Sequence, residues 1–353
     1  MRIIQLLSNL SYGDGVSNYA IALNNLFERC GYETGIYASY ISDRFPVGFA
    51  QDTAELRVKK NDILMYHFCI GHQLNYDVVK YQCKRILVYH NVTPPVFFRG
   101  ISRDWEHSCN DGIKGAHFLA DKVDRCLADS EFNKKDLINM GYKCPIDVLP
   151  LIIPFSDYEK EKDKAILGKY KDGRKNIVFV GRIAPNKKQE DIIEAFSYYK
   201  KYYNPVARLF LVGNYGGMES YYHKLESYVG RLGTEDIYFT GHISFSKMLA
   251  YYGIANLFLC MSEHEGFCVP LVEAMYFHVP VIAYDSSAIA ETLGGSGVLL
   301  KEKNPLEIAA LINRILSDDG LEDNIIQEQN RRLKELRPDI VEEKAIQYIE
   351  KIL

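Results

Sequence analysis

The chain has 353 residues and a formal net charge of −4, from 42 basic and 46 acidic residues. This length exceeds one ordinary domain of about 100–200 residues, so we expect two domains. Hydrophobic residues make up 47% of the chain and charged residues 25%, which excludes a disordered or collagen-like protein. A slightly acidic chain is not typical of a protein that binds nucleic-acid phosphates, so we expect no nucleic-acid partner.

Cysteine usage and hydropathy indicate the cellular location. The eight cysteines are scattered without a Cys-x-x-Cys pair, which favours reduced thiols in the cytoplasm. No run approaches the roughly 18 apolar residues of a membrane span. The apolar start of the chain is too short for a signal peptide and reads as a buried strand. We therefore expect a cytoplasmic protein.

The first half of the chain alternates short apolar runs with helical patterns, as in a parallel sheet covered on both faces. A helix is expected after the first strand, because apolar residues recur with a period of 3.6 residues from Val16 to Cys30 and Gly31 follows as a C-cap glycine. The expected strands are Arg2–Ser8, Gly35–Tyr40, Ile63–Phe68, Arg85–His90, Cys126–Ala128 and Ile146–Leu149.

The second half shows the same alternation more clearly. The expected strands are Asn176–Val180, Ala207–Val212, Ile237–Thr240, Leu257–Cys260 and Val281–Tyr284. The expected helices are Asp191–Tyr203, Met218–Leu232, Lys247–Tyr252, one between the last two strands, and Leu306–Leu316. The stretch Pro154–Asn176 contains a run of charged residues and separates the halves, so we interpret it as the connection between two domains.

The densest group of polar residues follows the strand Leu257–Cys260. Pro270 suits the first turn of a helix, whose free N–H groups can hold an anion. Glu265 lies in the preceding loop and Glu273 about one turn inside the helix. Two carboxylates are suited to accept hydrogen bonds from hydroxyl groups, such as those of a sugar and a ribose. A capped helix with one exposed and one paired glutamate would give the same pattern.

Basic and glycine-rich loops follow other strands. Arg182 and Lys187 come after the strand Asn176–Val180 and could together hold a diphosphate. The turn that contains Gly15 precedes the first helix, where a ligand could approach the backbone. His90 ends the strand Arg85–His90 and could contact a ligand there. Taken singly, each could instead be a solvated loop, a simple turn or a structural histidine.

In the order of these motifs the chain resembles the retaining glycosyltransferases of family 4, of the type found in bacterial surface-polysaccharide pathways. Glu265 and Glu273 have the spacing of the E-x7-E signature of that family. The resemblance implies an α/β protein of the GT-B fold, in which two Rossmann-like doubly wound parallel-sheet domains face a cleft. The acceptor-side domain would cover residues 1–154, and the donor-binding domain residues 155–337. A last helix at 338–353 would pack back on the first domain.

The resemblance also implies roles for single residues. Arg182 and Lys187 match the pair that binds the donor diphosphate, Glu265 the residue that contacts sugar hydroxyls, and Glu273 the residue that holds the ribose. His90 matches a histidine beside the transferred sugar. The remaining matches are donor-binding positions, namely Gly15 near the phosphate, His242 at the base, and Gly266, Phe267 and Cys268 through their backbone.

The implied reaction moves a hexose from a nucleotide-diphosphate sugar to a glycan or lipid-linked glycan, with retention of configuration. GDP-mannose is slightly favoured over a UDP-hexose. No Asp-x-Asp motif occurs, so no metal or other cofactor is expected. Peripheral association with the inner face of the membrane stays open, because many relatives use lipid-linked acceptors.

Three other readings remain. The first is a nucleotide-sugar epimerase of the same fold, and the second is a non-catalytic module that binds sugar nucleotides. The third is an NAD-type oxidoreductase built on the glycine turn before the first helix. It lacks the acidic residue expected at a strand end about 20 residues further on.

Overall fold

The computed structural model describes residues 1–352, which form two compact units. The first unit contains Met1–Val96, Asp104–Pro154 and the chain from Leu336 onward, and the second contains Phe97–Arg103 and Phe155–Glu335. The chain therefore returns to the first unit after completing the second. Helix α13 (Pro338–Glu350) belongs to this returning segment and contacts helix α1 (Gly15–Arg29) of the same unit. Residue 353, the last of the expected helix, lies outside the described residues.

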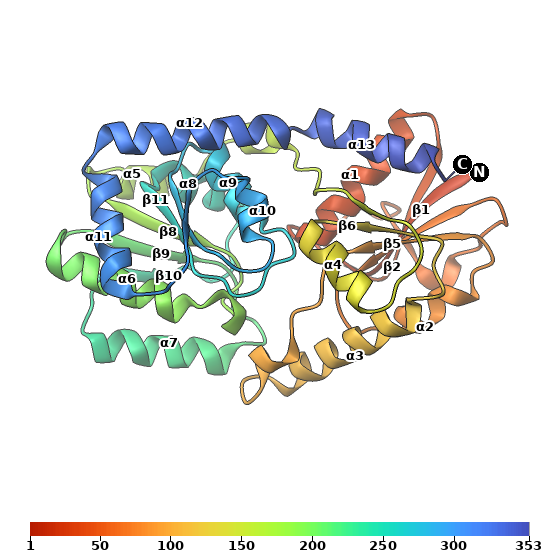
Figure 1. Cartoon of the computed structure of the whole chain (residues 1–353), viewed down its shortest axis with the longest axis horizontal. Helices are drawn as coiled ribbons and strands as arrows, with labels where there is room; N and C mark the ends of the chain where they lie inside the picture. Colours follow the sequence, from red (N-terminus) through yellow and green to blue (C-terminus); the bar gives the residue numbers. More distant parts are fainter. Residues whose placement is uncertain (353) are drawn as a thin grey trace. The chain divides into compact units, whose positions relative to one another are not determined.

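The first unit contains a seven-stranded parallel sheet in the order β3-β2-β1-β4-β5-β6-β7 (Figure 1). Its strands are β1 (Arg2–Leu10), β2 (Glu33–Ile41), β3 (Gln51–Asp52), β4 (Ile63–Phe68), β5 (Lys84–Tyr89), β6 (Arg125–Ala128) and β7 (Ile146–Val148). Besides α1 and α13, its helices are α2 (Leu74–Asp77), α3 (Arg103–Leu119) and α4 (Glu131–Asn139).

Helix α1 ends as the sequence predicts. Gly31 adopts a positive φ of 85°, which a glycine reaches without steric cost. Its N–H donates to the carbonyl of Glu28, and the N–H of Tyr32 donates to the carbonyl of Phe27. The rings of Phe27 and Tyr32 also contact each other, with centroids 6.3 Å apart. These are the bonds and the apolar contact of a Schellman motif, which directs the chain into β2.

The second unit contains a six-stranded parallel sheet in the order β10-β9-β8-β11-β12-β13. Its strands are β8 (Asn176–Val180), β9 (Arg208–Val212), β10 (Ile237–Phe239), β11 (Leu257–Cys260), β12 (Val281–Tyr284) and β13 (Val298–Leu300). Its helices are α5 (Lys164–Tyr170), α6 (Gln189–Tyr202), α7 (Glu219–Leu232), α8 (Phe245–Ile254), α9 (Val269–Tyr276), α10 (Ile289–Leu293), α11 (Pro305–Leu316) and α12 (Asp319–Glu335).

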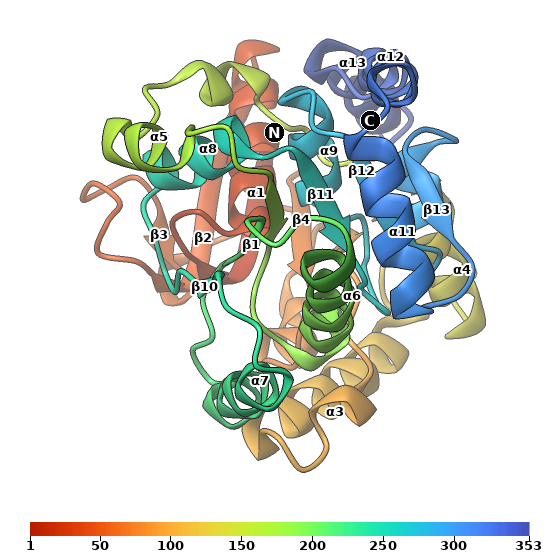
Figure 2. The ribbon, with the colours of Figure 1, turned by 90° about the vertical axis from the view of Figure 1, so that its left-hand side faces the viewer.

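The central strands of the second sheet are apolar because helices cover both faces. Every residue of β8, β9 and β11 is buried. Helices α6 and α11 lie side by side (Figure 2). The charged stretch interpreted as a connection contributes a further helix, since α5 packs on α8. The alternation of short strands and helices in the sequence thus gives two doubly wound sheets.

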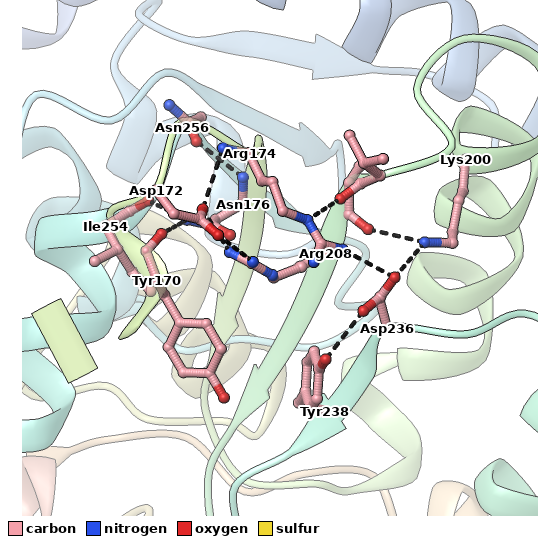
Figure 3. A network of polar contacts seen from close by, with 12 residues as sticks. Tyr170, Asp172, Arg174, Asn176, Lys200, Arg208, Asp236, Tyr238, Ile254 and Asn256 are labelled. Atoms are coloured by element: carbon pink, nitrogen blue, oxygen red, sulfur yellow. Dashed lines mark hydrogen bonds and ion pairs between the residues drawn. The ribbon is translucent and has the colours of Figure 1, made fainter. Parts of the chain in front are cut away.

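A polar network closes the amino-terminal edge of the second sheet (Figure 3). Arg208, the first residue of β9, donates to Asp172 over 2.9 Å through one guanidinium nitrogen and also through the other. This hydrogen bonding lowers the pKa of Asp172 to about 2. Asp236 accepts from Lys200 at 2.6 Å and pairs with Arg174 at 3.0 Å. These ion pairs occupy the amino-terminal edge of the sheet. Ligands of such sheets bind at the opposite, carboxyl-terminal edge.

Candidate functional site

In both sheets the strand order reverses beside the first strand of the unit, between β1 and β4 and between β8 and β11. Ligands of open α/β sheets bind at such points, outside the carboxyl ends of the strands. The loops that follow β8 and β11 carry most of the sequence-predicted site residues. Of the ten predicted residues, His90 and Gly15 lie in the first unit and the others lie in the second.

Lys187 and Glu265 meet across the carboxyl edge of the second sheet. Lys187 ends a short 3-10 turn, Pro185–Lys187, and its Nζ lies 2.6 Å from each carboxylate oxygen of Glu265. The two side chains retain 20% and 10% of their accessible surface. Burial by itself would lower the pKa of Lys187, but the carboxylate of Glu265 outweighs it and the pKa is raised. The ammonium group therefore stays charged, and a ligand that engages either residue must act on the pair.

Backbone contacts hold the Glu265 loop in place. The carbonyl of Asn186 accepts from the N–H of Glu263 at 2.8 Å, and the Asn186 side chain donates to the carbonyl of His264 at 3.1 Å. The N–H of Glu265 donates to the hydroxyl of Ser287 at 2.8 Å. The loops after β8, β11 and β12 are thereby tied together. The position of Glu265 is thus fixed by residues from all three loops.

Helix α9 begins at Val269 and has Pro270 in its first turn, as the sequence predicts. Cys268 precedes it in a left-handed conformation with φ of 72°. Phe267 and Cys268 are buried, Gly266 is partly exposed, and the carbonyl of Phe267 accepts from the Thr292 hydroxyl. Pro270 has no N–H, and the N–H of Leu271 donates to the carbonyl of Cys268, so the other N–H groups at this helix start belong to Val269 and the preceding loop. The helix dipole favours an anion there.

Glu273 lies inside α9 with its carboxylate between two buried tyrosines. The hydroxyl of Tyr252 donates to one oxygen at 2.7 Å, and the hydroxyl of Tyr158 donates to the other at 3.1 Å. Burial raises the pKa of Glu273 and the two hydroxyls act against it. The sequence analysis missed both tyrosines, which lie 115 and 21 positions away in the chain. Each oxygen of the Glu273 carboxylate has a second lone pair beyond the one that a tyrosine hydroxyl uses, and a ligand can donate to it.

Arg182 and His242 occupy exposed loop positions in the second unit. Arg182 follows β8, and its carbonyl accepts from the side chain of Gln189 at 3.0 Å. His242 follows β10. Gly181 and Gly213 bring these loops together, because the N–H of Gly181 donates to Val212 and Gly213 bridges to Gly241. These backbone contacts among the loops after β8, β9 and β10 fix the positions of the Cα atoms of Arg182 and His242.

His90 lies just after β5 and takes part in a buried chain of polar side chains in the first unit. Its Nδ1 lies 2.8 Å from Asp129, and its Nε2 lies 3.0 Å from Nδ1 of His67. The Nε2 of His67 lies 2.8 Å from Oε1 of the Gln5 side chain. Burial lowers the pKa of His67 well below its usual value. A neutral His67 that donates to Gln5 must accept from His90, so both ring nitrogens of His90 are committed to the protein.

Of the hydrogen-bonded side chains of Gln5, His67, His90 and Asp129, only His90 was singled out from the sequence. The sequence analysis gave neither Asp129 nor His67 a role. Gln5, His67 and His90 come from β1, β4 and the end of β5, which are neighbours in the sheet. Their meeting follows from the strand order and not from a local pattern. The side chain of His90 is 4% exposed, so it belongs to the interior of the first unit.

Gly15 is the first residue of α1. The preceding Asp14 caps the helix, with its carboxylate accepting from the N–H of Ser17 at 3.0 Å. A Cβ added at Gly15 would meet nothing within 4 Å, so the protein itself does not require a glycine there. A ligand bound close to the start of α1 would need this open space beside the backbone of Gly15.

Acidification should destabilise the protein through His264. Burial lowers the pKa of this residue to about 4. The folded state thus binds its proton less readily than the unfolded chain, and stability falls as pH drops from about 6.5 towards 4. We expect His264 to account for about 1–2 kcal/mol of this loss, after allowance for its remaining solvent contact.

Urea unfolding of the wild type and of His264→Gln over this pH range measures the contribution. The curve of the variant should be flatter. Parallel curves would show that the titration of His264 does not differ between the folded and unfolded states.

Residues 159–332 match the family described as glycosyl transferases group 1. We refer to this matched segment, which is just under half of the chain, as the group 1 domain. It covers most of the second unit, including Lys187, Glu265 and Glu273. No helix within the described residues is long and apolar enough to cross a membrane.

Curated relatives resemble about half of this chain at modest identity. A glycosyltransferase of Methanocaldococcus jannaschii is 29% identical over 167 residues, which cover 46% of this chain and 41% of that protein. The O-antigen chain mannosyltransferase B of Escherichia coli is 24% identical over 213 residues, covering 59% of this chain and 55% of the relative. The chain thus matches about half or less of the length of these proteins.

Solved structures match the whole chain. Sucrose-phosphate synthase from Thermosynechococcus elongatus superposes with a TM-score of 0.78 at 14% identity, covering 100% of this chain and 99% of that one. The HepE protein of Anabaena, in complex with UDP-glucose, gives 0.75 at 15% identity and 99% coverage of both chains. The fold is GT-B, as the sequence resemblance predicted, and the group 1 domain confirms the resemblance to GT-B glycosyltransferases.

Proposed function

We propose that the protein is a retaining glycosyltransferase that moves a hexose from a nucleotide-diphosphate sugar to a glycan or lipid-linked glycan. The observation that carries this proposal is the Lys187–Glu265 pair, which lies beside the start of α9 within the group 1 domain. An ammonium group, a carboxylate and a helix start together match a sugar diphosphate. The second unit is the donor-binding half in this proposal, and the first unit binds the acceptor.

Lys187 and Arg182 bind the diphosphate and neutralise the charge that develops when the glycosidic bond breaks. Lys187 is 2.6 Å from Glu265, so donor binding moves the ammonium group towards phosphate and frees the carboxylate for the sugar hydroxyls. The N–H groups of the loop Gly266–Cys268 and the start of α9 add further donors to the diphosphate. In this proposal, donor binding breaks the Lys187–Glu265 ion pair. Lys187 then donates to the diphosphate, and Glu265 accepts from the sugar hydroxyls.

Glu273 binds the ribose through the lone pairs that Tyr158 and Tyr252 leave free, and His242 contacts the base. From the first unit, the backbone of Gly15 borders the phosphate. His90 borders the transferred sugar through its backbone and ring edge, because both its ring nitrogens are hydrogen bonded. Retention of configuration requires the acceptor to attack on the face from which the diphosphate leaves, and Glu265 orients the sugar without attacking it.

The donor is proposed to be GDP-mannose, with a UDP-hexose as the other choice. The mannosyltransferases among the relatives support mannose as the sugar. The structural neighbour with bound UDP-glucose supports a UDP donor. The proposed reaction uses no metal ion, because charged side chains and a helix start take the place of a cation on the diphosphate. We also propose that the protein works at the inner face of the membrane.

A thermal-shift panel of UDP, GDP, ADP and NAD tests the proposal. Binding of a nucleoside diphosphate to the folded state should raise the melting temperature, and a concentration of 100 times Kd contributes about 2.7 kcal/mol. The preferred base then selects the donor for a transfer assay, in which the anomeric configuration of the product is read by NMR. A shift with NAD alone would contradict the proposal, and so would an inverted product for the retaining mechanism.

A further inference from the structure

Two thiols and a carboxylate converge behind the start of α9. Cys260 ends β11, Glu265 lies in the following loop, and Cys268 precedes the helix. Their two sulfur atoms and one carboxylate oxygen all lie within 4.8 Å of one another, and all three residues are buried. The exposed fractions are 1% for Cys260, 8% for Cys268 and 9% for Glu265. An ion would therefore reach the group from the loop side, past Cys268 and Glu265.

This set of donor atoms suits a thiophilic divalent cation. Zn²⁺ binds cysteine sulfur at about 2.3 Å and carboxylate oxygen at about 2.0–2.2 Å, so its ligand atoms lie about 3.5–3.8 Å apart in a tetrahedral site. The distances between the ligand atoms must therefore shorten by at most about 1.3 Å, which small side-chain rotations supply. Three protein ligands leave a fourth position open to water or another ligand.

We propose that Cys260, Glu265 and Cys268 form a binding site for a thiophilic divalent cation such as Zn²⁺. A cation bound there occupies the carboxylate that the proposed donor sugar contacts, so it inhibits transfer. The inhibition rests on the proposed function, but the binding does not. The bound ion has no part in the transfer reaction.

Charge balance supports the site, because the buried group is neutral both with and without the cation. Before binding, Lys187 compensates the negative charge of Glu265, and thiols in their protonated form add no charge. On binding, two metal–sulfur bonds form and two protons leave for the solvent, so that two thiolates compensate Zn²⁺. Affinity should therefore rise with pH as two protons are released for each ion.

The test uses the full chain, reduced and freed of metal by a chelator. It is equilibrated with Zn²⁺ by dialysis, and bound zinc is measured by elemental analysis. Cys260→Ala removes one ligand, and Cys126→Ala is the matched control, since Cys126 is also buried and lies 3.6 Å from a second thiol, Cys144. The wild type and the control should hold one more ion per chain than Cys260→Ala.

Equal zinc content in the wild type, Cys260→Ala and Cys260→Ser overturns the proposal. Zinc uptake that is lost in Cys126→Ala but kept in both Cys260 variants also overturns the proposal. Absorption of the cadmium-loaded protein checks for thiolate ligation, which should be absent in Cys260→Ala if this variant remains folded.

A second measurement separates binding from inhibition. Zinc-loaded protein, dialysed free of excess metal, is compared with metal-free protein in thermal-shift titrations with UDP-glucose and GDP-mannose. Zinc should raise the Kd for the bound nucleotide sugar at least tenfold in the wild type and leave it unchanged in Cys260→Ala. If neither nucleotide sugar binds metal-free protein, the proposed function fails while the zinc stoichiometry still decides the site. Undiminished binding of nucleotide sugar to zinc-loaded wild type overturns the inhibition.

Discussion

Replacing Lys187 by alanine is expected to lower kcat/KM for sugar transfer by about 10²–10³-fold, the loss typical of one preorganised charge-stabilising group. The same change leaves Glu265, with only 10% of its side chain exposed, without its cation. Removal of one partner of a buried ion pair is strongly destabilising, so we also expect the free energy of unfolding to fall by about 2–4 kcal/mol. Initial rates and urea unfolding measure the two effects.

The two effects can be separated with a double variant and a neighbouring residue. Adding Glu265→Gln to Lys187→Ala removes the unpaired charge, so stability should recover while transfer stays impaired. Lys188→Ala is the matched control, because Lys188 makes only longer contacts of 3.7 Å and 3.5 Å with Glu190 and Glu263. It should resemble the wild type in both assays. Transfer at the wild-type rate by Lys187→Ala would remove the role given to this residue.

Gly213→Ala is expected to destabilise the second unit by about 3–5 kcal/mol, among the larger losses from single substitutions. A Cβ at this position would lie 1.9 Å from the carbonyl oxygen of Gly181 and 2.7 Å from its carbon. The obstructing atoms belong to the backbone, so no side-chain rotation relieves the clash. The φ of 156° adds strain. The Arg182 loop must then shift, and nucleotide binding should weaken with stability.

Gly230→Ala provides the comparison for this substitution. Gly230 lies within α7, and a Cβ there would meet nothing within 4 Å. Alanine is the better helix former, so a gain of up to about 1 kcal/mol is expected. Urea unfolding of the two variants tests the contrast. Equal stability of Gly213→Ala and the wild type would show that the two loops can separate at little cost.

Much of the fold could be predicted because it follows from local patterns. Apolar runs of three to seven residues predict the strands, and Gly31 marks the end of α1 through the backbone conformation it permits. The elements for which no range was predicted are strands β3 and β13 and helices α2, α3, α4, α5, α10 and α12. Two of them show why. Strand β13 has three residues, none of them fully buried, and α5 begins within a run of charges. Their formation depends on the sheet edge and the helix on which they pack.

The candidate site divides in the same way. The sequence by itself determined which residue types follow the strands, and the spacing of Glu265 and Glu273 indicated two carboxylates at one helix start. Only the tertiary structure decided their partners. It paired Glu265 with Lys187, placed Glu273 between Tyr158 and Tyr252, and joined His90 to Asp129 and His67. Such partners come from distant parts of the chain, because parallel strand order brings their loops to one edge.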